Sequence, residues 1–323
     1  MSPSRIPLPL AAAAIAVLAG CSPAAAPAAT APGPETVEVD NCGTVVAFPA
    51  APERVVTIKS TSTEMLLALG VGDRIVGTAF QDGPLPADLA EAGGDLPVLA
   101  DRVPSEEAVL AVEPDLVYAG WESNLTAEGA GERDELLALG VASYVSPAAC
   151  KAPGYRPEKL TWDAVFAEIR EVGAIFRAED AAEELIAEQQ NQLDDVAADP
   201  RGLDALWYSS GTETPYVGAG IGAPQLILDT VGLANIAADV EDSWSPLGWE
   251  SVVAADPDVI VVVDAAWNTA EDKIALLRSD PALAALTAVR EDRFLVVPFA
   301  ASEAGVRSAP AAADLARQLA ELP

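Results

Sequence analysis

The chain alternates between short, apolar, β-rich runs and segments whose apolar residues recur at helical spacing. Val55 to Ile58 is one such run, and Thr63 to Leu69 follows it at helical spacing and stops at Gly70, a residue suited to a helix C-cap. The same alternation predicts strands over residues 74–77, 116–119, 142–145, 205–208, 259–263 and 294–297, and helices over residues 106–112, 133–139, 224–231, 249–254, 272–278 and from 311 onward. Helices between strands of this length indicate an α/β fold with parallel, doubly wound sheets.

The middle of the chain, residues 162–199, is rich in helix formers. A break near Arg177 is one option there. Residues 180–198 contain no glycine or proline, and they would form a helix roughly 28 Å long, about the width of a lobe. We therefore expect residues 162–199 to be a helical bridge.

The two sides of this bridge echo each other. A short helix, a Pro-Asp turn and an apolar strand follow in the same order from Glu107 to Tyr118 and from Glu250 to Val261. In both segments a glutamate stands seven residues before the proline. We predict two Rossmann-like lobes, residues 37–161 and 200–323, joined by one long rigid helix.

The amino terminus has the features of an export signal. Arg5 precedes an apolar stretch from Leu8 to Leu18, which is too short to cross a bilayer of about 30 Å. The Leu-Ala-Gly-Cys sequence ending at Cys21 resembles a bacterial lipobox, in which the cysteine receives lipid; an ordinary cleaved signal is the alternative. We expect residues 1–20 to be a lipoprotein signal peptide and residues 21–36, rich in proline and alanine, to be a tether.

Composition excludes several classes of function. The formal net charge of −32 would repel phosphate backbones, so nucleic acid is not an expected partner. The chain contains no histidine, which rules out histidine-dependent triads and the common histidine-bearing zinc sites. No phosphate-binding P-loop occurs, and we expect neither a metal site nor a cofactor.

Two cysteines, Cys42 and Cys150, remain if Cys21 carries lipid. An even pair in an oxidising compartment favours a disulfide, and two separate thiols are the alternative.

Several segments together resemble the cobalamin-, siderophore- and haem-binding proteins of ABC importers. The resemblance lies in residues 52–56, 63–77 and 215–239 and in the repeated Glu-x₆-Pro-Asp segment, and it extends over most of residues 37–320. It implies two lobes bridged by a single helix, a ligand in the cleft between them, and small lobe closure.

The same resemblance implies the partners. One glutamate of each lobe, here Glu107 and Glu250, would dock onto a permease of two membrane subunits served by a cytoplasmic ATPase. The plainer interpretation is an acidic residue stabilised by its helix dipole. The protein would be a monomer on the extracytoplasmic face of the cell membrane, attached only through its lipid.

A narrower resemblance concerns the ligand. Residues 59–62 depart from the common family pattern. Together with residues 121–124, 148–155 and 267–269 they are similar to actinobacterial-type lipoproteins proposed to bind coenzyme F420-0, a deazaflavin precursor without its glutamate tail.

The candidate ligand-binding residues follow predicted strands, where ligands of such folds bind. Lys59, Ser60 and Thr61 open a helix and would suit a phosphate or carboxylate, although a plain N-cap is the alternative. Arg307 could pair an anionic group, although a lone arginine is usually at the surface, and Lys151, Tyr155 and Arg156 form another candidate cluster. The remaining candidates are aromatic residues expected at strand ends or in loops facing the cleft: Trp121, Tyr208, Tyr216, Trp244 and Trp267.

Other aromatic residues and a glycine-rich segment have plainer interpretations. Trp162 and Trp207 are expected in the core. Residues 218–223 fit the dinucleotide motif G-x-G-x-x-A, but we interpret them as a tight turn before helix 224–231.

Three hypotheses of function follow. The first is a binding protein for a bulky, anionic, aromatic metabolite, with F420-0 foremost. The second is a binder of a ferric siderophore, haem or cobalamin. A secreted enzyme using paired carboxylates is remote, because 50 acidic residues make chance pairs abundant.

Overall fold

The computed structural model describes Met1 and residues 36–322. Apart from Met1, the expected signal peptide lies outside the described residues, as do Cys21 and nearly all of the expected tether. None of the helices within residues 36–322 has the length and apolar character needed to cross a bilayer.

The first lobe is built on a five-stranded sheet in the order β5-β4-β3-β6-β7, and all its neighbouring strands are parallel. This is the doubly wound arrangement that the alternating pattern predicts. The strands are β3 (Val55–Ile58), β4 (Ile75–Ala79), β5 (Val98–Ala100), β6 (Leu116–Ala119) and β7 (Ala142–Val145). The helices are α1 (Ser60–Ala68), α2 (Ala90–Gly93), α3 (Glu106–Leu110) and α4 (Arg133–Ala138).

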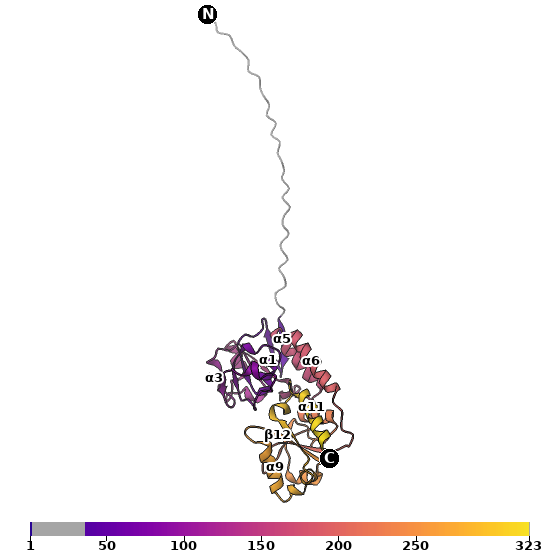
Figure 1. The fold of residues 1–323 in the computed structure, drawn as a ribbon. Coiled ribbons are helices and arrows are strands. Elements are labelled where there is room, and N and C mark those ends of the chain that lie inside the picture. Colours follow the sequence, from indigo (N-terminus) through magenta and orange to yellow (C-terminus); the bar gives the residue numbers. More distant parts are fainter. Residues whose placement is uncertain (2–35, 323) are drawn as a thin grey trace. The chain divides into compact units, whose positions relative to one another are not determined.

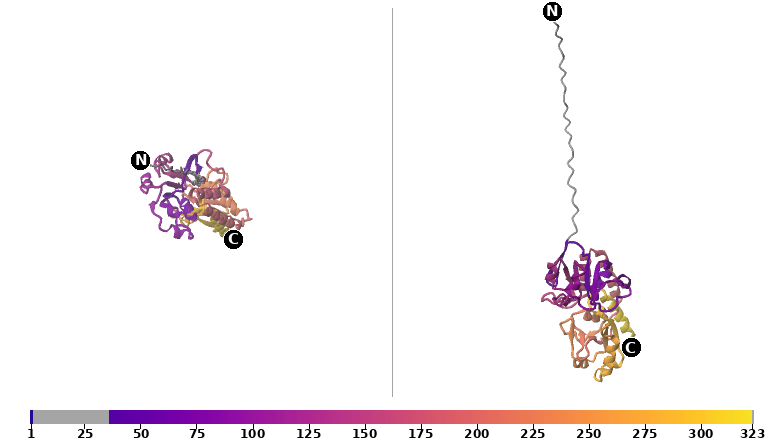
Figure 2. Two further views of the ribbon diagram at one scale, coloured as in Figure 1. Left: turned by 90° about the horizontal axis from the view of Figure 1, so that it is seen from above. Right: turned by 90° about the vertical axis from the view of Figure 1, so that its left-hand side faces the viewer.

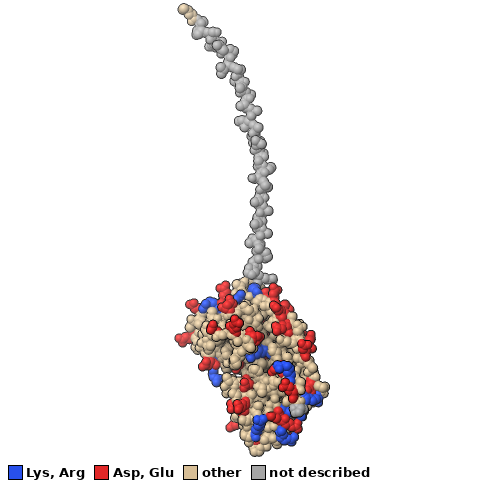
Figure 3. All heavy atoms as spheres, viewed as in Figure 1, with Lys and Arg blue, Asp and Glu red and all other residues tan. Residues whose placement is uncertain are grey.

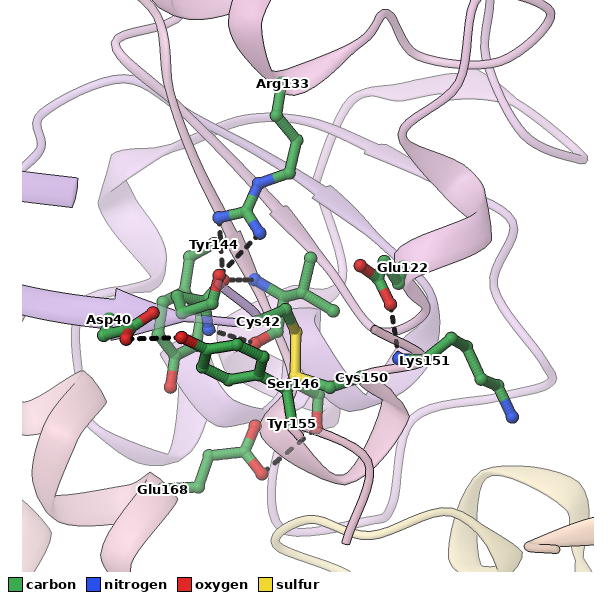
Figure 4. The surroundings of a disulfide bond; sticks show 12 residues. Asp40, Cys42, Glu122, Arg133, Tyr144, Ser146, Cys150, Lys151, Tyr155 and Glu168 are labelled. Carbon is green, nitrogen blue, oxygen red and sulfur yellow. Dashed lines mark hydrogen bonds between the residues drawn. A yellow bond between two sulfur atoms is a disulfide. The ribbon is translucent and has the colours of Figure 1, made fainter. Parts of the chain in front are cut away.

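An antiparallel hairpin, β1 (Val37–Asn41) and β2 (Thr44–Phe48), precedes this sheet and was not predicted. Cys42 in its turn is disulfide-bonded to Cys150, so the predicted bridge is confirmed. The bond ties the hairpin to the loop that follows β7 and the short 3₁₀ helix η3 (Pro147–Ala149), as Figure 4 shows.

The second lobe has a mixed sheet, in the order β11-β9-β8-β12-β13. Parallel pairing links β8 to β12, β12 to β13, and β8 to the short β10, whereas β9 and β11 run antiparallel to their neighbours. The strands are β8 (Asp204–Ser210), β9 (Tyr216–Gly218), β10 (Ala234–Asn235), β11 (Trp244–Pro246), β12 (Val259–Asp264) and β13 (Phe294–Pro298). The helices are α7 (Ala223–Val231), α8 (Trp249–Ala255), α9 (Ala270–Ser279), α10 (Thr287–Arg290) and α11 (Ser308–Glu321).

Two predictions for this lobe were wrong in detail. A purely parallel sheet was expected, and Tyr216 and Trp244 were placed in loops, but they begin β9 and β11. Each of these strands has three residues, too few for hydrophobic alternation to reveal it. Residues 218–223 thus follow a short antiparallel strand rather than the parallel strand of a dinucleotide-binding unit.

The prediction of one long rigid helix between the lobes was wrong: the bridge consists of two helices, α5 (Trp162–Phe176) and α6 (Glu179–Asp194). Arg177 adopts a left-handed conformation, with φ 57° and ψ 42°, and ends α5 at the break that the sequence left open. The helices pack side by side, and α6 also lies along α11 of the second lobe (Figure 1). Helix α6 ends four residues before the expected Ala198, because two aspartates at its end oppose the helix dipole.

The two lobes are distinct in Figures 1 and 2, yet their cores meet at the seam. The core of the first lobe includes Ala304 and Val306 from the second lobe, together with Ile186 of α6. Trp207 is fully buried in the second core, and the half-buried Trp162 packs against both, so the predicted core positions are confirmed. The α/β class with two lobes is likewise confirmed, and the continuous core disfavours large lobe movements.

Candidate ligand-binding site

A cavity of about 420 Å³ lies between the lobes. Its lining comes from the carboxyl ends of β6 and β7 in the first lobe and of β8 and β13 in the second, together with β9, β11 and the start of α7. This is the edge of a parallel sheet at which α/β folds bind ligands. The volume falls within the range of small-molecule sites.

Five aromatic side chains line this cavity, and we call them the aromatic wall. They are Trp121 from the first lobe and Tyr216, Trp244, Trp267 and Phe299 from the second. The ring of Trp244 is nearly parallel to that of Phe299, at 7° and 6.3 Å between centroids, and to that of Tyr216, at 11° and 6.5 Å. Trp121 and Trp267 each present an edge-to-face ring to Phe299.

Four of these five residues were candidates from the sequence, and Phe299 was not. It follows β13 directly, in the 3₁₀ helix η5 (Phe299–Ser302). The rule that site residues follow parallel strands could have selected Phe299. Because Pro298 stands directly before it, the residues around Phe299 resembled the end of an apolar strand. Tyr216 and Trp267 remain 42% and 51% exposed, so their rings are accessible from the cavity. Flat, accessible rings suit a conjugated ligand.

Hydroxyl groups occupy much of the remaining lining. Thr61 lines the cavity as expected, whereas Ser60 is buried beside Asp82 and does not. The other hydroxyl-bearing residues, which the sequence analysis did not select, are Ser123, Ser146, Ser209, Ser210, Ser243 and Ser302. Such groups can donate to and accept from a polyol or a carbonyl.

The prediction that Lys59 faces an anionic ligand was wrong. Its side chain is 1% exposed and is ion-paired with Asp82. The ammonium also lies 3.9 Å from the ring centroid of Trp121 and 4.8 Å from that of Phe299. Lys59 therefore supports the aromatic wall from behind, and its charge is already compensated.

The backbone at Lys59 explains why this lysine turns inward. Its φ of 83° and ψ of 152° fall in a region that residues other than glycine rarely occupy. The amide of Ser60, expected to be free at the helix start, instead donates to the Asp82 carboxylate at 3.3 Å. Asp82 thus occupies the position at which an external anion was expected.

Arg307 was also predicted to bind the ligand, and it too is engaged elsewhere. Its guanidinium makes two hydrogen bonds, of 2.5 and 2.6 Å, to the carboxylate of Glu64 in α1. Burial raises the pKa of Glu64, and the hydrogen bond and charge of Arg307 act against that rise. Because Glu64 and Arg307 belong to different lobes, the pair ties the seam together and is not part of the cavity lining.

Tyr208 does not reach the cavity either, contrary to the prediction. It is fully buried in the second lobe, where its hydroxyl donates to the carbonyl of Gly211 at 2.6 Å. Burial raises its pKa to about 12. Both faces of β8 are covered, so only Ser209 and Ser210 at the strand end meet the cavity.

Acidic groups outnumber basic ones around the cavity. Glu122, Asp242 and Glu303 contribute carboxylates, and Lys151 is the single basic residue in the lining that the structure describes. Glu303 accepts a hydrogen bond from the indole nitrogen of Trp121 at 3.2 Å across the seam. Burial raises the pKa of Glu303 to about 7, although the charge of Lys59 opposes the rise. Acidic side chains are also spread over the visible face of both lobes (Figure 3).

The predicted cluster of Lys151, Tyr155 and Arg156 is divided. Lys151 reaches the cavity and lies 3.6 Å from Asp242 of the other lobe. Tyr155 instead donates to Asp40 at 2.8 Å, and Arg156 is exposed away from the lining.

Glu107 and Glu250 hold matching positions in the two lobes. Each is exposed in the first turn of its helix, α3 or α8. The aspartate of each Pro-Asp turn also acts alike: Asp115 accepts from the amide of Arg54 at 3.0 Å, and Asp258 from that of Asp204 at 3.0 Å. The sequence repeat is therefore a structural repeat that places one exposed glutamate on each lobe.

Known proteins of one kind are similar to this chain. Residues 55–301 match the family model described as periplasmic binding protein. An uncharacterized ABC transporter substrate-binding lipoprotein, YvrC of Bacillus subtilis, is 24% identical over 74% of this chain and 72% of its own length. The vitamin B12-binding protein of Pectobacterium atrosepticum is 27% identical over 84% of this chain and 90% of its own. The crystal structure of an ABC-type Fe³⁺-hydroxamate transport system from Saccharomonospora viridis has a TM-score of 0.74 and 27% identity, covering 88% of this chain and 98% of that one.

Proposed function

The chain belongs to the periplasmic binding protein family, and from that premise we propose that it is the solute-binding protein of an ABC importer. It captures a bulky, ring-bearing metabolite between its lobes and delivers it, unchanged, to a permease. The similar lipoprotein YvrC and the vitamin B12-binding protein support the transport role, since both names describe binding proteins.

The aromatic wall carries this proposal. Five rings gathered from two lobes around one cavity provide flat surfaces that a conjugated ligand can cover without covalent chemistry. The seam contacts, Arg307 with Glu64 and Glu303 with Trp121, keep the lobes nearly fixed, so binding requires little ordering of the protein.

We propose coenzyme F420-0 as the ligand. Its deazaflavin ring would lie against the aromatic wall, and its polyol chain would meet the serine hydroxyls. With Lys59 and Arg307 engaged elsewhere, Lys151 remains to meet its anionic end.

A ferric siderophore or cobalamin is the second candidate ligand, and the printed functions of two similar proteins favour it. Haem belongs to the same class. Since the chain has no histidine, a haem iron would need another axial ligand here, such as the Tyr216 phenol.

Delivery would use surfaces outside the cavity. Glu107 and Glu250, one on each lobe, would dock onto the two membrane subunits of the permease, which a cytoplasmic ATPase drives. Lipid on Cys21 would hold the protein, as a monomer, at the extracytoplasmic face of the membrane.

The test is a titration of the purified protein with F420-0, followed by quenching of tryptophan fluorescence. We expect the fluorescence to be quenched, because three of the six tryptophans line the cavity, and the quenching to saturate at one ligand per protein. Cyanocobalamin, haemin and a ferric hydroxamate serve as comparison ligands. Tight binding of one of these with no response to F420-0 would replace the proposed ligand with the second class. Conversion of any bound ligand to a product would contradict the transport role.

A further inference from the structure

Lys151 stands apart from the other cations near the seam. Lys59 and Arg307 are 1% and 12% exposed and are held in ion pairs with buried carboxylates. The Lys151 side chain is 61% exposed and lies 3.6 Å from Asp242, a longer distance than the 2.5 Å between Arg307 and Glu64. An exposed pair at this distance contributes little free energy, so either partner can be exchanged.

The backbone of Lys151 is nevertheless firmly placed. The preceding residue, Cys150, is disulfide-bonded to Cys42. The amide of Lys151 donates to the carboxylate of Glu122, which follows Trp121 of the aromatic wall. Figure 4 shows the lysine side chain extending away from the disulfide, with its ammonium group clear of the residues drawn. A fixed backbone with an exposed, loosely paired ammonium is suited to binding a charged group that arrives with a ligand.

Asp242 is fixed from the opposite lobe. Its carbonyl accepts from the amide of Ile221 at 3.2 Å, and the neighbouring Ser243 carbonyl accepts from Ala219 at 3.0 Å. Two residues later β11 begins with Trp244, so the loop that carries Asp242 also carries part of the aromatic wall. The Lys151–Asp242 pair therefore spans the cavity from one lobe to the other, beside the rings.

We propose that Lys151 is the residue that recognises an anionic group on the ligand, with a phosphate or carboxylate replacing Asp242 as its partner. The inference rests on the proposed function and adds an orientation: the ring lies against the aromatic wall and the anionic end lies between Lys151 and Asp242. Asp242 acts as a resident anion that an incoming anion must displace from Lys151. If Lys151 were absent, Asp242 would disfavour an anionic ligand more than a neutral one.

The experiment compares two ligands that share one ring. F420-0 carries an anionic tail, and the same deazaflavin with an unphosphorylated ribityl chain does not. Dissociation constants of both are measured by fluorescence for the wild type and for Lys151→Gln. We expect Lys151→Gln to weaken the binding of F420-0 by roughly tenfold and to leave the binding of the ligand without the anionic tail unchanged.

Three further variants sharpen the result. Lys151→Arg should retain the preference for the anionic ligand. Asp242→Asn should strengthen F420-0 by about threefold, because the competing carboxylate is gone. Lys159→Gln is the matched control: Lys159 is also exposed and paired with an aspartate, Asp229, but does not line the cavity, so neither ligand should respond.

The two levels of the account fail differently. If both ligands bind the wild type and Lys151→Gln weakens them equally, or not at all, the assignment of Lys151 is overturned and the proposed function stands. If neither deazaflavin binds the wild type, the proposed ligand is wrong and the orientation falls with it.

Discussion

The two lobes are built from the same repeat, yet they contribute different chemistry to the cavity. Glu113 and Asp256 stand at matching positions, each before the proline of a Pro-Asp turn, and both adopt positive φ, at 48° and 44°. The first lobe adds a hairpin and a disulfide to a parallel sheet, and it supplies Lys59 and Lys151. The second lobe inserts two short antiparallel strands.

Those two strands account for the difference. Strands β9 and β11 carry Tyr216 and Trp244 to the cavity, and with Trp267 and Phe299 they make the aromatic wall largely a property of the second lobe. The comparison shows how a repeated scaffold acquires an asymmetric site: short additions at one sheet edge of the second lobe supply two of the rings, and the first lobe supplies Lys151, the one basic residue of the described lining.

Arg307→Met tests whether the lobes depend on each other. It leaves the Glu64 carboxylate buried without its partner, so we expect the free energy of unfolding to fall by about 3–5 kcal/mol at pH 8. The loss should shrink at lower pH, because burial raises the pKa of Glu64 and protonation then removes the uncompensated charge.

Urea denaturation at two pH values measures both effects. Arg317→Met is the matched control, since Arg317 lies on α11, the helix that Arg307 directly precedes, with its side chain 73% exposed. A loss that does not depend on pH would mean that packing, and not the ion pair, joins the lobes.

Removing the disulfide should destabilise the first lobe more than the second. The bond closes a loop across 108 positions of the first lobe alone, so Cys42→Ser with Cys150→Ser should lower the free energy of unfolding by about 2–4 kcal/mol. Hydrogen exchange should show the loss in the first lobe and not in the sheet of the second. Uniform loosening of both lobes would contradict this assignment.

Two tryptophans of the aromatic wall, Trp121 and Trp267, should respond differently to truncation. The ring of Trp121 packs against the Lys59 ammonium, and its indole nitrogen donates to Glu303. Trp121→Ala should therefore lower the free energy of unfolding by about 2–3 kcal/mol and also weaken ligand binding. Trp267 is 51% exposed, so Trp267→Ala should weaken the ligand by about tenfold with little change in stability. Paired thermal unfolding and ligand titration measure both. Equal loss of stability in the two variants would remove the distinction.

The smallest expected effect is on the pH dependence of stability. The pKa of Glu303 is about 7 in the folded protein and about 4.3 for an unperturbed glutamate. At a pH between these two values, the folded state therefore binds a proton that the unfolded state has lost. The contribution of Glu303 to stability is therefore complete below about pH 4.3 and is lost progressively as the pH rises from there through 7.

Glu303→Gln isolates this contribution, because glutamine resembles the protonated acid. From pH 5 to pH 8 the variant should lose less stability than the wild type. Glu168, whose pKa burial also raises to about 7, remains in both proteins and cancels in the difference. Identical slopes in the two proteins would show that Glu303 stays ionised.

The local sequence pattern predicted the strands whose formation depends on their own residues. The strands at 55–58, 116–119 and 142–145 coincide with the structure, because short apolar runs between helices are buried on both faces. The three-residue strands β9 and β11 could not be predicted, because the pairing of β9 with β8 and of β11 with β9, and not their own composition, creates them.

The cation assignments failed for a longer-range reason. Lys59 and Arg307 find their partners 23 and 243 positions away, and no local pattern reveals such pairs. One signal was present: Glu64 stands directly before the apolar run Met65 to Leu67 in an otherwise uncharged helix, and a buried carboxylate needs a partner. The aromatic candidates succeeded more often, since large rings at strand ends either face a cleft or fill the core, and only Tyr208 took the second position.

The central proposal is that the cavity between the lobes holds one molecule of coenzyme F420-0. Native mass spectrometry of the protein purified from cells that make deazaflavins tests this most directly. The account predicts one bound species per chain with the mass of F420-0, absent from a Trp121→Ala, Trp267→Ala double variant. A bound corrinoid or iron complex of equal occupancy, or a deazaflavin that persists in the double variant, would contradict it.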